Sequence, residues 1–464
     1  MRATAVASIT ADLLRMYDKA GPRYTSYPTA VEFSDSFTAD AYGAKLDEAA
    51  TLDSEPLSLY LHLPFCEERC TFCGCAVIAT RRREVVSRYL DYLLREIGML
   101  ADRLGHRRRV IQYHWGGGTP TYLTSAELTA LHAGVQRHFG IDPQAEGGVE
   151  VDPRVTTREQ IDTLRALGFN RLSMGVQDFT PEVQEAIGRR QSAAATRSLF
   201  YDARGAGFHS INVDLVYGLP RQRLETFSRT IESVVEMRPE RVAVYSYAHV
   251  PWLRANQKKI EPRDLPSPEL KLDLFGAAVD VFLDAGYRQI GMDHFARPDD
   301  ELARAAERGA LHRNFMGYTT RLATDMVAAG LTAIGDIRGA YAQNVKKLSS
   351  YYAALDAGRF PIERGLPLTR DDLLRRFVIT QLMCNFTVDL AEVERRFGVS
   401  VEDYFARELI ALASGPAAHG FVTMRPDRLQ VTVRGRLFVR NICMVFDHYL
   451  RQKPVEQRMF SRTI

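Results

Sequence analysis

The stretch "YLHLPFCEERCTFCGCAVI", residues 60–78, holds Cys66, Cys70, Cys73 and Cys75 within ten positions. The whole chain of 464 residues contains only six cysteines, so most of its thiols lie in one place. A β-rich run, "LSLYLHL" at 57–63, comes directly before them. The sequence therefore predicts a strand followed by a loop whose cysteines act together at one site.

Clustered cysteines mean different things in different compartments. In a reducing cytoplasm they are poor candidates for a disulfide framework, which leaves metal ligation or redox chemistry. The other two cysteines, Cys384 and Cys443, stand alone in helix-like segments. We expect each of these two to be a buried, small apolar residue.

Composition points to a globular protein of the cytoplasm. Hydrophobic residues make up 46% of the sequence and charged residues 25%, which is not the balance of a disordered or fibrous chain. No apolar run is as long as a membrane-spanning helix requires, and the first 20 residues lack the apolar core of a secretory signal. The net charge of +3, from 60 basic and 57 acidic residues, is too small for a global nucleic-acid field. We therefore expect a cytoplasmic protein.

Six β-rich runs recur along the first half of the chain, at 57–63, 109–115, 148–152, 170–176, 210–218 and 241–248. Helical patterns separate them, which indicates βαβ units and a parallel sheet, either open and doubly wound or curled into a full or partial barrel. Ligands of such sheets bind at the carboxyl ends of the strands. The segments that follow the strands read "PFCEERCTFCGC", "GGGTPT", "DPR", "QDFT", "GLPRQ" and "HVPWL". These segments are where we expect the chemistry.

Helix boundaries follow from periodicity and capping. Apolar residues spaced 4, 3, 4 and 3 positions apart between Val86 and Leu100 predict an amphipathic helix. Thr124 and Thr156 each have a glutamate three positions later, the spacing of a capping box at a helix start. Gly168 suits a helix end.

The second half of the chain changes in character. "KKIEPRDLPSPELK" at 258–271 is rich in proline and charge and is predicted to be a linker, followed by a helix and a short strand. Beyond residue 365 the pattern indicates helices with one hairpin, "GFVTMRPDRLQVT", in a broadly winged-helix outline. Such a module permits DNA binding but is also a common packing unit, since fold alone does not give function.

The spacing of the clustered cysteines points to iron. C-x-x-x-C-x-x-C from Cys66 to Cys73 places three thiolates on one loop, where they can ligate three corners of an iron–sulfur cube and leave the fourth iron open. Zinc is an alternative, although Cys73 and Cys75 are only two positions apart, a poor fit to the usual spacing of zinc-ligand pairs. A two-cysteine redox motif is another alternative, which would leave the remaining thiols unused.

The loop resembles the signature of the radical SAM superfamily, in which S-adenosylmethionine (SAM) chelates the open iron. Tyr60, six residues ahead of Cys66, and "CGC" at 73–75 are similar to the oxygen-independent coproporphyrinogen III oxidases. Related heme-chaperone and methyltransferase branches usually lack the fourth cysteine. The resemblance continues through "GPRYTSYPTA", "YHWGGGTPTYL", "EVDPR", "RLSMGVQDF", "INVDLVYGLP", "GMDHFARPDDELA", "LHRNFMGYTT", "YAQN" and "RNICMVFDHYLRQK".

This resemblance implies an α/β fold, a partial (βα)6 TIM-like radical SAM barrel with a smaller, mostly helical C-terminal domain. We expect an N-terminal extension at 1–50 that contributes to the active site and a catalytic barrel at 51–360. Residues 361–464 are then expected to form the helical domain with the winged-helix-like hairpin.

Candidate site residues follow from the same matching. Gly116, Gly117 and Gly118 come after a strand, where glycine permits either close approach of the backbone to a ligand or a tight βα turn. The resemblance implies a SAM contact there. The implied cluster ligands are Cys66, Cys70 and Cys73. The implied SAM contacts are Tyr60, Phe72, Gly117, Gly118, Thr119, Glu150, Gln177, Arg189, Asp214, Ala248 and Ile334.

The resemblance also implies two SAM molecules per chain, one on a 4Fe-4S cluster and one beside it. Cys75 is then a candidate catalytic residue that positions the second SAM or relays hydrogen; the alternative is a plain loop residue. Met316 and Arg321 stand where other members carry glutamine. Loss of an amide there would weaken a contact to the second SAM, or it marks a subfamily.

The implied reaction converts two propionate side chains of coproporphyrinogen III to vinyl groups and gives protoporphyrinogen IX, by way of a 5'-deoxyadenosyl radical made from SAM. The implied partners are this substrate and a low-potential electron donor such as flavodoxin or ferredoxin. We expect a monomer that binds neither nucleic acid nor membrane. A substrate with four carboxylates requires cationic partners, and Arg23 is one candidate.

Other functions stay open on the sequence. A radical SAM methyltransferase or heme-modifying relative would keep the cluster loop, and a heme-binding chaperone would keep the cluster without oxidase activity. "CGC" and the C-terminal match argue against the chaperone. A winged-helix regulator would show salt-sensitive binding to duplex DNA.

Overall fold

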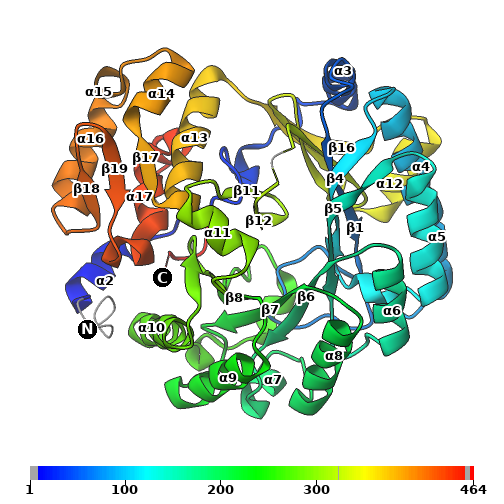
Figure 1. Cartoon of the computed structure of the whole chain (residues 1–464), viewed down its shortest axis with the longest axis horizontal. Coiled ribbons are helices and arrows are strands. Elements are labelled where there is room, and N and C mark those ends of the chain that lie inside the picture. The colour runs from blue at the N-terminus through cyan, green and yellow to red at the C-terminus, as the bar shows by residue number, and fades with distance from the viewer. Residues whose placement is uncertain (1–8, 322, 455–459, 464) are drawn as a thin grey trace.

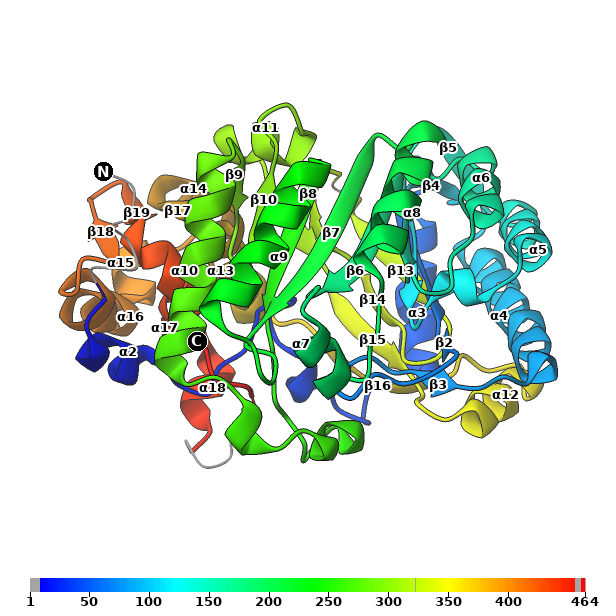
Figure 2. The same ribbon diagram turned by 90° about the horizontal axis from the view of Figure 1, so that it is seen from below.

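The computed structural model of the chain describes residues 9–321, 323–454 and 460–463. Within them, the main sheet has twelve strands in the order β16-β15-β14-β13-β1-β4-β5-β6-β7-β8-β10-β9. Six neighbouring strands pair in parallel and form a partial barrel (Figure 2). They are β1 (Leu57–Leu63), β4 (Arg109–Gly117), β5 (Gly140–Val151), β6 (Arg171–Gln177), β7 (Ser210–Tyr217) and β8 (Arg241–Ser246). The predicted α/β fold with a partial six-stranded barrel is confirmed.

Five of these strands lie within two residues of their predicted bounds, whereas the predicted start of β5 at 148 is wrong. The strand begins at Gly140 and first pairs with Arg109 of β4. A register shift between Val110 and Gln112 separates this early pairing from the rest. The early part of β5 reads "GIDPQAEGG". Glycine and proline have low strand propensity, so propensity alone does not predict a strand in this segment.

Helices cover the outer face of the barrel and form an arc around the strands in Figure 1. They are α4 (Arg83–Leu104), α5 (Ser125–Gln136), α6 (Arg158–Ala166), α7 (Pro181–Ala186), α8 (Ala193–Gly205), α9 (Leu224–Met237) and α10 (Pro268–Asp284). The stripe predicted between Val86 and Leu100 is buried in the main core. Thr124 caps α5 through the predicted box with Glu127. Gly168, with φ of +94°, follows the end of α6 as predicted.

The capping box predicted at Thr156 is wrong by one residue. Thr157 is the N-cap of α6, and its partner is Gln160. Thr156 instead donates to the carbonyl of Asp152 (2.8 Å), and its hydroxyl lies 2.7 Å from that of Thr121. Two adjacent threonines have the same capping propensity, so a tertiary contact decides between them.

Further strands extend the sheet on both sides of the barrel. On one side β13 (Asp325–Ala329) pairs in parallel with β1, and β14 (Ile334–Ile337), β15 (Ala340–Asn344) and β16 (Ile362–Pro367) continue in antiparallel fashion. On the other side β10 (His294–Ala296) and β9 (Arg288–Ile290) add to β8. Because β16 pairs with β15, the main sheet runs past residue 360, the boundary predicted from the sequence, to Pro367.

A smaller unit of helices and a three-stranded sheet lies at one end of the barrel (Figure 1). It comprises α13 (Arg370–Asn385), β17 (Thr387–Asp389), α14 (Leu390–Phe397), α15 (Val401–Tyr404), α16 (Ala406–Leu412), β18 (Val422–Met424), β19 (Arg428–Val431), α17 (Val439–Phe446) and α18 (His448–Gln452). The predicted hairpin is β18 and β19. Cys384 and Cys443 are both buried, as predicted.

The N-terminal segment packs against both parts of the molecule. From α2 (Ala11–Tyr17), the ring of Tyr17 contacts those of Phe421 and Phe438 in the C-terminal unit. Further along, α3 (Ala39–Ala50) packs against α4 of the barrel. Among the described residues, no helix has the length and apolar character needed to cross a lipid bilayer.

A buried ion pair joins the first residue of β13 to the segment between α4 and β4. The side chains of Arg107 and Asp325 are both withdrawn from solvent, and Nη1 of the arginine lies 2.5 Å from the carboxylate. The same guanidinium donates to the carbonyls of Ala49 (3.1 Å) and Glu55 (3.0 Å). Asp325 also accepts from the backbone N–H of Arg338 (2.6 Å). One side chain thus holds the end of α3, the approach to β1 and the first residue of β13.

We expect Arg107→Met to lower the free energy of unfolding by about 3–5 kcal/mol, because it leaves the Asp325 carboxylate buried without its cation. Urea denaturation measures this change. Arg109→Met is the matched control, since the Arg109 side chain is 60% exposed in its pair with Asp142. The control should cost less than about 1 kcal/mol. Equal losses in the two variants would show that the buried pair has no special role.

Candidate active site

β1 delivers the cysteine loop to the carboxyl rim of the barrel. Directly after it, β2 (Phe65–Cys66) and β3 (Ile78–Ala79) pair in parallel and close the base of the loop. The Ile78 N–H donates to the carbonyl of Pro64 (2.7 Å), and the Thr80 N–H donates to that of Cys66 (3.1 Å). The two ends of the loop are therefore held together, which keeps its four cysteines close to one another.

Side chains from η3 (Ala255–Lys259), the 3₁₀ turn after β8, hold this loop in shape. The amide of Asn256 donates to three backbone carbonyls of the loop at 2.9 to 3.1 Å, and the neighbouring Gln257 donates to a fourth at 2.8 Å. The carbonyls bound by Asn256 are those of Cys70, Thr71 and Cys73. Sequence reasoning missed both residues, because no motif or spacing connects them to the cysteines.

All four cysteines line one cavity of about 280 Å³, here called the cysteine cavity. Its other walls include residues of β4, β5, β6, β7 and β8. Most of the implied SAM contacts line it as well: Phe72, Gly117, Gly118, Thr119, Glu150, Gln177, Arg189 and Asp214. The barrel thus brings residues from 66 to 245 to one place.

Two arginines flank the thiol of Cys70. Nη2 of Arg154 lies 3.6 Å from its sulfur and Nη1 of Arg189 lies 3.9 Å from it. Asp152 binds both guanidinium groups, at 2.7 Å and 2.8 Å. Sequence reasoning named Arg189 but not Arg154 or Asp152, although the segment "DPR" after β5 marked their position. The two positive charges favour an anionic group in the cavity.

The thiols differ in acidity. Hydrogen bonding from Cys75, including its N–H at 3.4 Å, outweighs burial and lowers the pKa of Cys73 to about 6. Burial raises the pKa of Cys66 to about 11, although the hydroxyl of Thr119, 3.3 Å from the sulfur, acts in the opposite direction. Metal ligation at Cys66 therefore requires the loss of a proton.

The glycine segment after β4 lies directly against the base of the cysteine loop. The Gly118 N–H donates to the carbonyl of Leu63 (2.9 Å), and the Thr119 N–H donates to that of Phe65 (2.8 Å). A Cβ at position 118 would lie 2.6 Å from the Phe65 carbonyl oxygen, so only glycine fits. Gly117 has φ of +119°, and a Cβ there would lie 2.7 Å from an imidazole ring of β1. Glycine is needed here for contact between backbones as well as for the turn.

Two carboxylates of the cysteine cavity have opposite pKa shifts. Burial acts to raise the pKa of Glu150, but contacts with His114 (3.6 Å) and the N–H of Gly117 (3.0 Å) outweigh it, so the net shift is downward. Burial raises the pKa of Asp214 to about 6, in spite of a hydrogen bond from Ser173 (2.9 Å). Glu150 is therefore ionised at neutral pH.

A larger cavity of about 560 Å³, here called the chamber, adjoins the cysteine cavity. Tyr60 and Ile334 line the chamber and not the cysteine cavity. Of the four cysteines only Cys75 lines both. Ala248 lines neither, and its carbonyl accepts from Gln257 (3.1 Å). The implied SAM contacts are thus distributed over two adjoining spaces.

The two positions that depart from the family lie outside both spaces. Met316 lies in the turn between β11 (His312–Asn314) and β12 (Gly317–Thr319) and lines another cavity, which shares Glu150, Ser173, Asp214 and Tyr245 with the cysteine cavity. Arg321 is exposed and donates to the carbonyl of Gln144 (3.4 Å). The loss of glutamine at these positions therefore removes no side chain from the wall of either space.

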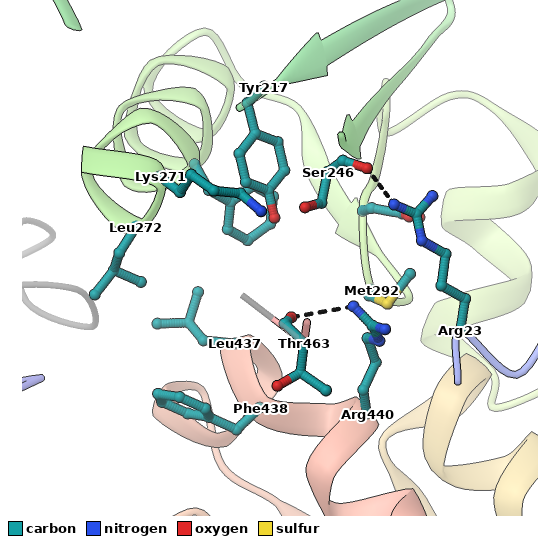
Figure 3. Close-up of a pocket in the computed structure, with 12 residues that line it drawn as sticks. Arg23, Tyr217, Ser246, Lys271, Leu272, Met292, Leu437, Phe438, Arg440 and Thr463 are labelled. Atoms are coloured by element: carbon teal, nitrogen blue, oxygen red, sulfur yellow. Dashed lines mark hydrogen bonds between the residues drawn. The ribbon is translucent and has the colours of Figure 1, made fainter. Parts of the chain in front are cut away.

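Arg23, the carboxylate partner suggested by the sequence, lines a fourth cavity that is much smaller. This cavity of about 40 Å³ lies between the barrel and the C-terminal unit, and Arg440 and Lys271 also line it (Figure 3). Arg23 donates to the carbonyl of Ser246, the last residue of β8. Arg23 therefore does not line the chamber or the cysteine cavity.

Comparison with known proteins places this arrangement in a family. A family model described as the radical SAM superfamily matches residues 60–234, and one described as the HemN C-terminal domain matches residues 368–438. An oxygen-independent coproporphyrinogen III oxidase of Escherichia coli (strain K12) is 48% identical over 452 residues, which cover 97% of this chain and 98% of the relative. One from Synechocystis is 43% identical over 459 residues, 98% of each chain.

A solved structure agrees with these sequences. It is described as coproporphyrinogen III oxidase (HemN) from Escherichia coli, a radical SAM enzyme. It matches with a TM-score of 0.89 at 47% identity and covers 92% of this chain and 98% of its own. The similarity therefore extends over the barrel and the C-terminal unit together.

We expect Asn256→Asp to weaken retention of an iron–sulfur cluster, because a carboxylate would face three carbonyl oxygens that now receive hydrogen bonds. After anaerobic reconstitution, the rate at which the visible cluster absorbance decays should rise several-fold, while the unfolding transition of the apoprotein stays near that of the wild type. Lys258→Gln, an exposed change on the same turn, is the control. Equal decay in the wild type and Asn256→Asp would exclude this positioning role.

Proposed function

This chain belongs to the oxygen-independent coproporphyrinogen III oxidases, radical SAM enzymes of heme biosynthesis, and we propose that Cys66, Cys70 and Cys73 hold its 4Fe-4S cluster. The enzyme decarboxylates two propionate side chains of coproporphyrinogen III to vinyl groups and gives protoporphyrinogen IX. The observation that supports the ligand assignment is the single cavity lined by all three thiols. Arg154 and Arg189 at its wall offset the negative charge of thiolates and cluster.

The alternatives that the loop alone left open are less consistent with the whole molecule. A zinc site or a two-cysteine redox pair would not use the large chamber that adjoins the cysteine cavity. The methyltransferase and chaperone alternatives usually lack the fourth cysteine of the loop, whereas the similarity to the oxidases extends over nearly the full chain. The C-terminal unit packs against the N-terminal segment through Tyr17, which supports a packing role rather than DNA binding.

The chemistry that the bound cofactors supply is one electron to SAM and a 5'-deoxyadenosyl radical that removes hydrogen from the carbon β to the carboxylate. The chain's own residues bind the cofactors and orient them. Gly117 and Gly118 let the backbone approach the cofactor, and the ionised Glu150 can accept two ribose hydroxyls. Gln177, Arg189 and Asp214 supply further polar contacts at the wall.

We also propose two SAM molecules per chain. Tyr60 and Ile334 line the chamber, whereas Gly118, Thr119 and Gln177 line the cysteine cavity, which supports two separate places for the cofactor. Phe72 and Ala248 are proposed contacts because of the family pattern. Equilibrium binding of labelled SAM measures how many SAM molecules bind per chain.

The remaining assignments are proposals of the same kind. The enzyme receives its electron from a low-potential donor such as flavodoxin or ferredoxin, and it acts as a cytoplasmic monomer without nucleic acid or membrane. The N-terminal extension at 1–50 is proposed to contribute to the active site, and residues 51–360 are proposed to carry the catalysis. The helical unit that follows completes the fold, with β16 as its connection to the barrel sheet.

We expect the reconstituted enzyme, supplied anaerobically with SAM, a low-potential reductant and coproporphyrinogen III, to give protoporphyrin by mass after oxidation, together with 5'-deoxyadenosine. Cys66→Ala, Cys70→Ala and Cys73→Ala should each lose the visible cluster absorbance and at least 99% of turnover, because each removes a ligand to the cluster. Cys443→Ala, at a buried thiol outside the site, is the control. Full activity in any of the three variants would overturn the ligand assignment.

We expect Cys75→Ser to separate cluster assembly from turnover, because Cys75 is the thiol shared by the cysteine cavity and the chamber. The variant should keep the cluster absorbance and the cleavage of SAM but lose at least 90% of porphyrin product. Loss of the cluster would identify Cys75 as a ligand instead. Unchanged product formation would identify it as a plain loop residue.

A further inference from the structure

The chamber has the dimensions and the position of a substrate site. Its volume of about 560 Å³ is twice that of the cysteine cavity and lies in the usual range for small-molecule pockets. It shares Arg69, Gly74, Cys75, Val77, Gly117 and Glu150 with the cysteine cavity, so a molecule in the chamber lies next to the cavity that is proposed to hold the cluster.

Part of the chamber lining is apolar. These residues come from the end of the cysteine loop, from the β11–β12 hairpin and from the turn between β13 and β14 with the start of β14. The apolar residues are Val77, Ile78, Phe315, Leu331, Ala333 and Ile334. Such a surface suits the carbon framework of a macrocycle, whose burial is favourable in proportion to area.

The remaining polar lining is dominated by positive charge. Arg69, Arg254, Lys346 and Arg364 line the chamber, whereas Glu150 is its only carboxylate among the described residues. These four basic residues come from the cysteine loop, the segment after β8, the end of β15 and β16. No local sequence pattern connects them, and only the folded sheet brings them around one space.

The two partly buried arginines are available to a ligand. Arg364 donates from Nε to the amide oxygen of Gln343 (2.8 Å), its neighbour across β15 and β16, and has no carboxylate within ion-pair distance among the described residues. The side chain of Arg254 likewise has no carboxylate partner in the described part of the chain. Lys346 lies 3.4 Å from Glu363 in an exposed pair, which costs little to exchange.

We propose that Arg254 and Arg364, with Lys346 and Arg69 around them, bind the propionate carboxylates of coproporphyrinogen III. This inference rests on the proposed function and identifies the substrate contacts within it. Guanidinium groups bind carboxylates in a bidentate manner, and four cations match the four carboxylates of the substrate. The macrocycle then packs against the apolar residues of the lining, and the propionate nearest Cys75 and Gly117 faces the cysteine cavity.

The same charges disfavour SAM as the final occupant of the chamber. SAM carries one carboxylate against an ammonium and a sulfonium, so a wall of four cations repels more of its charge than it attracts. A second SAM at Tyr60 and Ile334 therefore gives way to the tetracarboxylate. Labelled SAM should fall from two to one per chain when coproporphyrin III, the oxidised form of the substrate, is added in excess.

The number of carboxylates also predicts that the substrate binds more tightly than the product. Each decarboxylation removes one carboxylate and leaves one cation without a partner, so the product with two carboxylates binds more weakly than the substrate with four. Product inhibition constants should therefore exceed the KM for the substrate by about tenfold or more, the effect expected when a hydrogen bond between charged groups is removed.

The test compares Arg254→Gln and Arg364→Gln with the wild type in the reconstituted enzyme. Each should raise the KM for coproporphyrinogen III and the Kd for coproporphyrin III, read by porphyrin fluorescence, by about tenfold or more. Arg364→Lys keeps the positive charge but loses the bidentate guanidinium group. Its KM and Kd should therefore lie between those of the wild type and those of Arg364→Gln. Lys347→Gln is the matched control, because Lys347 is exposed next to Lys346 and does not line the chamber.

Cluster absorbance and substrate-independent cleavage of SAM should stay at the wild-type level in all variants, which separates substrate binding from folding. KM and Kd within twofold of the wild type in both Gln variants would overturn the proposal, as would a variant that loses the second SAM but keeps its substrate KM. Failure of the proposed function is a different result, in which the wild type itself forms no protoporphyrinogen. The binding measurement with coproporphyrin III would still test the arginines in that case.

Discussion

The approach of two backbone segments sets the geometry of this site. The N–H groups of Gly118 and Thr119 donate to carbonyls at the base of the cysteine loop, and no side chain larger than glycine fits at position 118. This contact places the ends of β1 and β4 side by side and directs the loop across the carboxyl rim of the barrel. Asn256 then holds the carbonyls of Cys70, Thr71 and Cys73 farther along the loop.

Two adjoining spaces follow from that arrangement, and their charges differ. In the cysteine cavity, Arg154 and Arg189 surround a cysteine and are themselves held by Asp152, which suits a fixed anionic cluster. In the chamber, the arginines have no carboxylate partners among the described residues, so their charges are available to an anionic ligand that binds reversibly. Cys75 lies on the wall between the two, so it is the thiol best placed to connect cofactor and substrate.

Local signals predicted much of the framework. The strand ends and the stripe of α4 follow from burial on one face, a property that the residue pattern carries directly. The error at Thr156 arose because two neighbouring threonines have equal capping propensity and a contact with Thr121 decides between them. The early part of β5 was missed because its pairing with β4 overrides the poor strand propensity of glycine and proline.

The sequence by itself determined the alternation of strands and helices, the cysteine spacing and the family, because each depends on residues close together in the chain or on an ordered series of short motifs. Tertiary structure alone decided which residues support that loop and which line the chamber. Asn256 holds carbonyls almost two hundred positions away, and Arg69, Arg254 and Arg364 meet around one space only after the sheet has formed. Long-range contacts of this kind leave no periodic or spaced pattern in a single sequence.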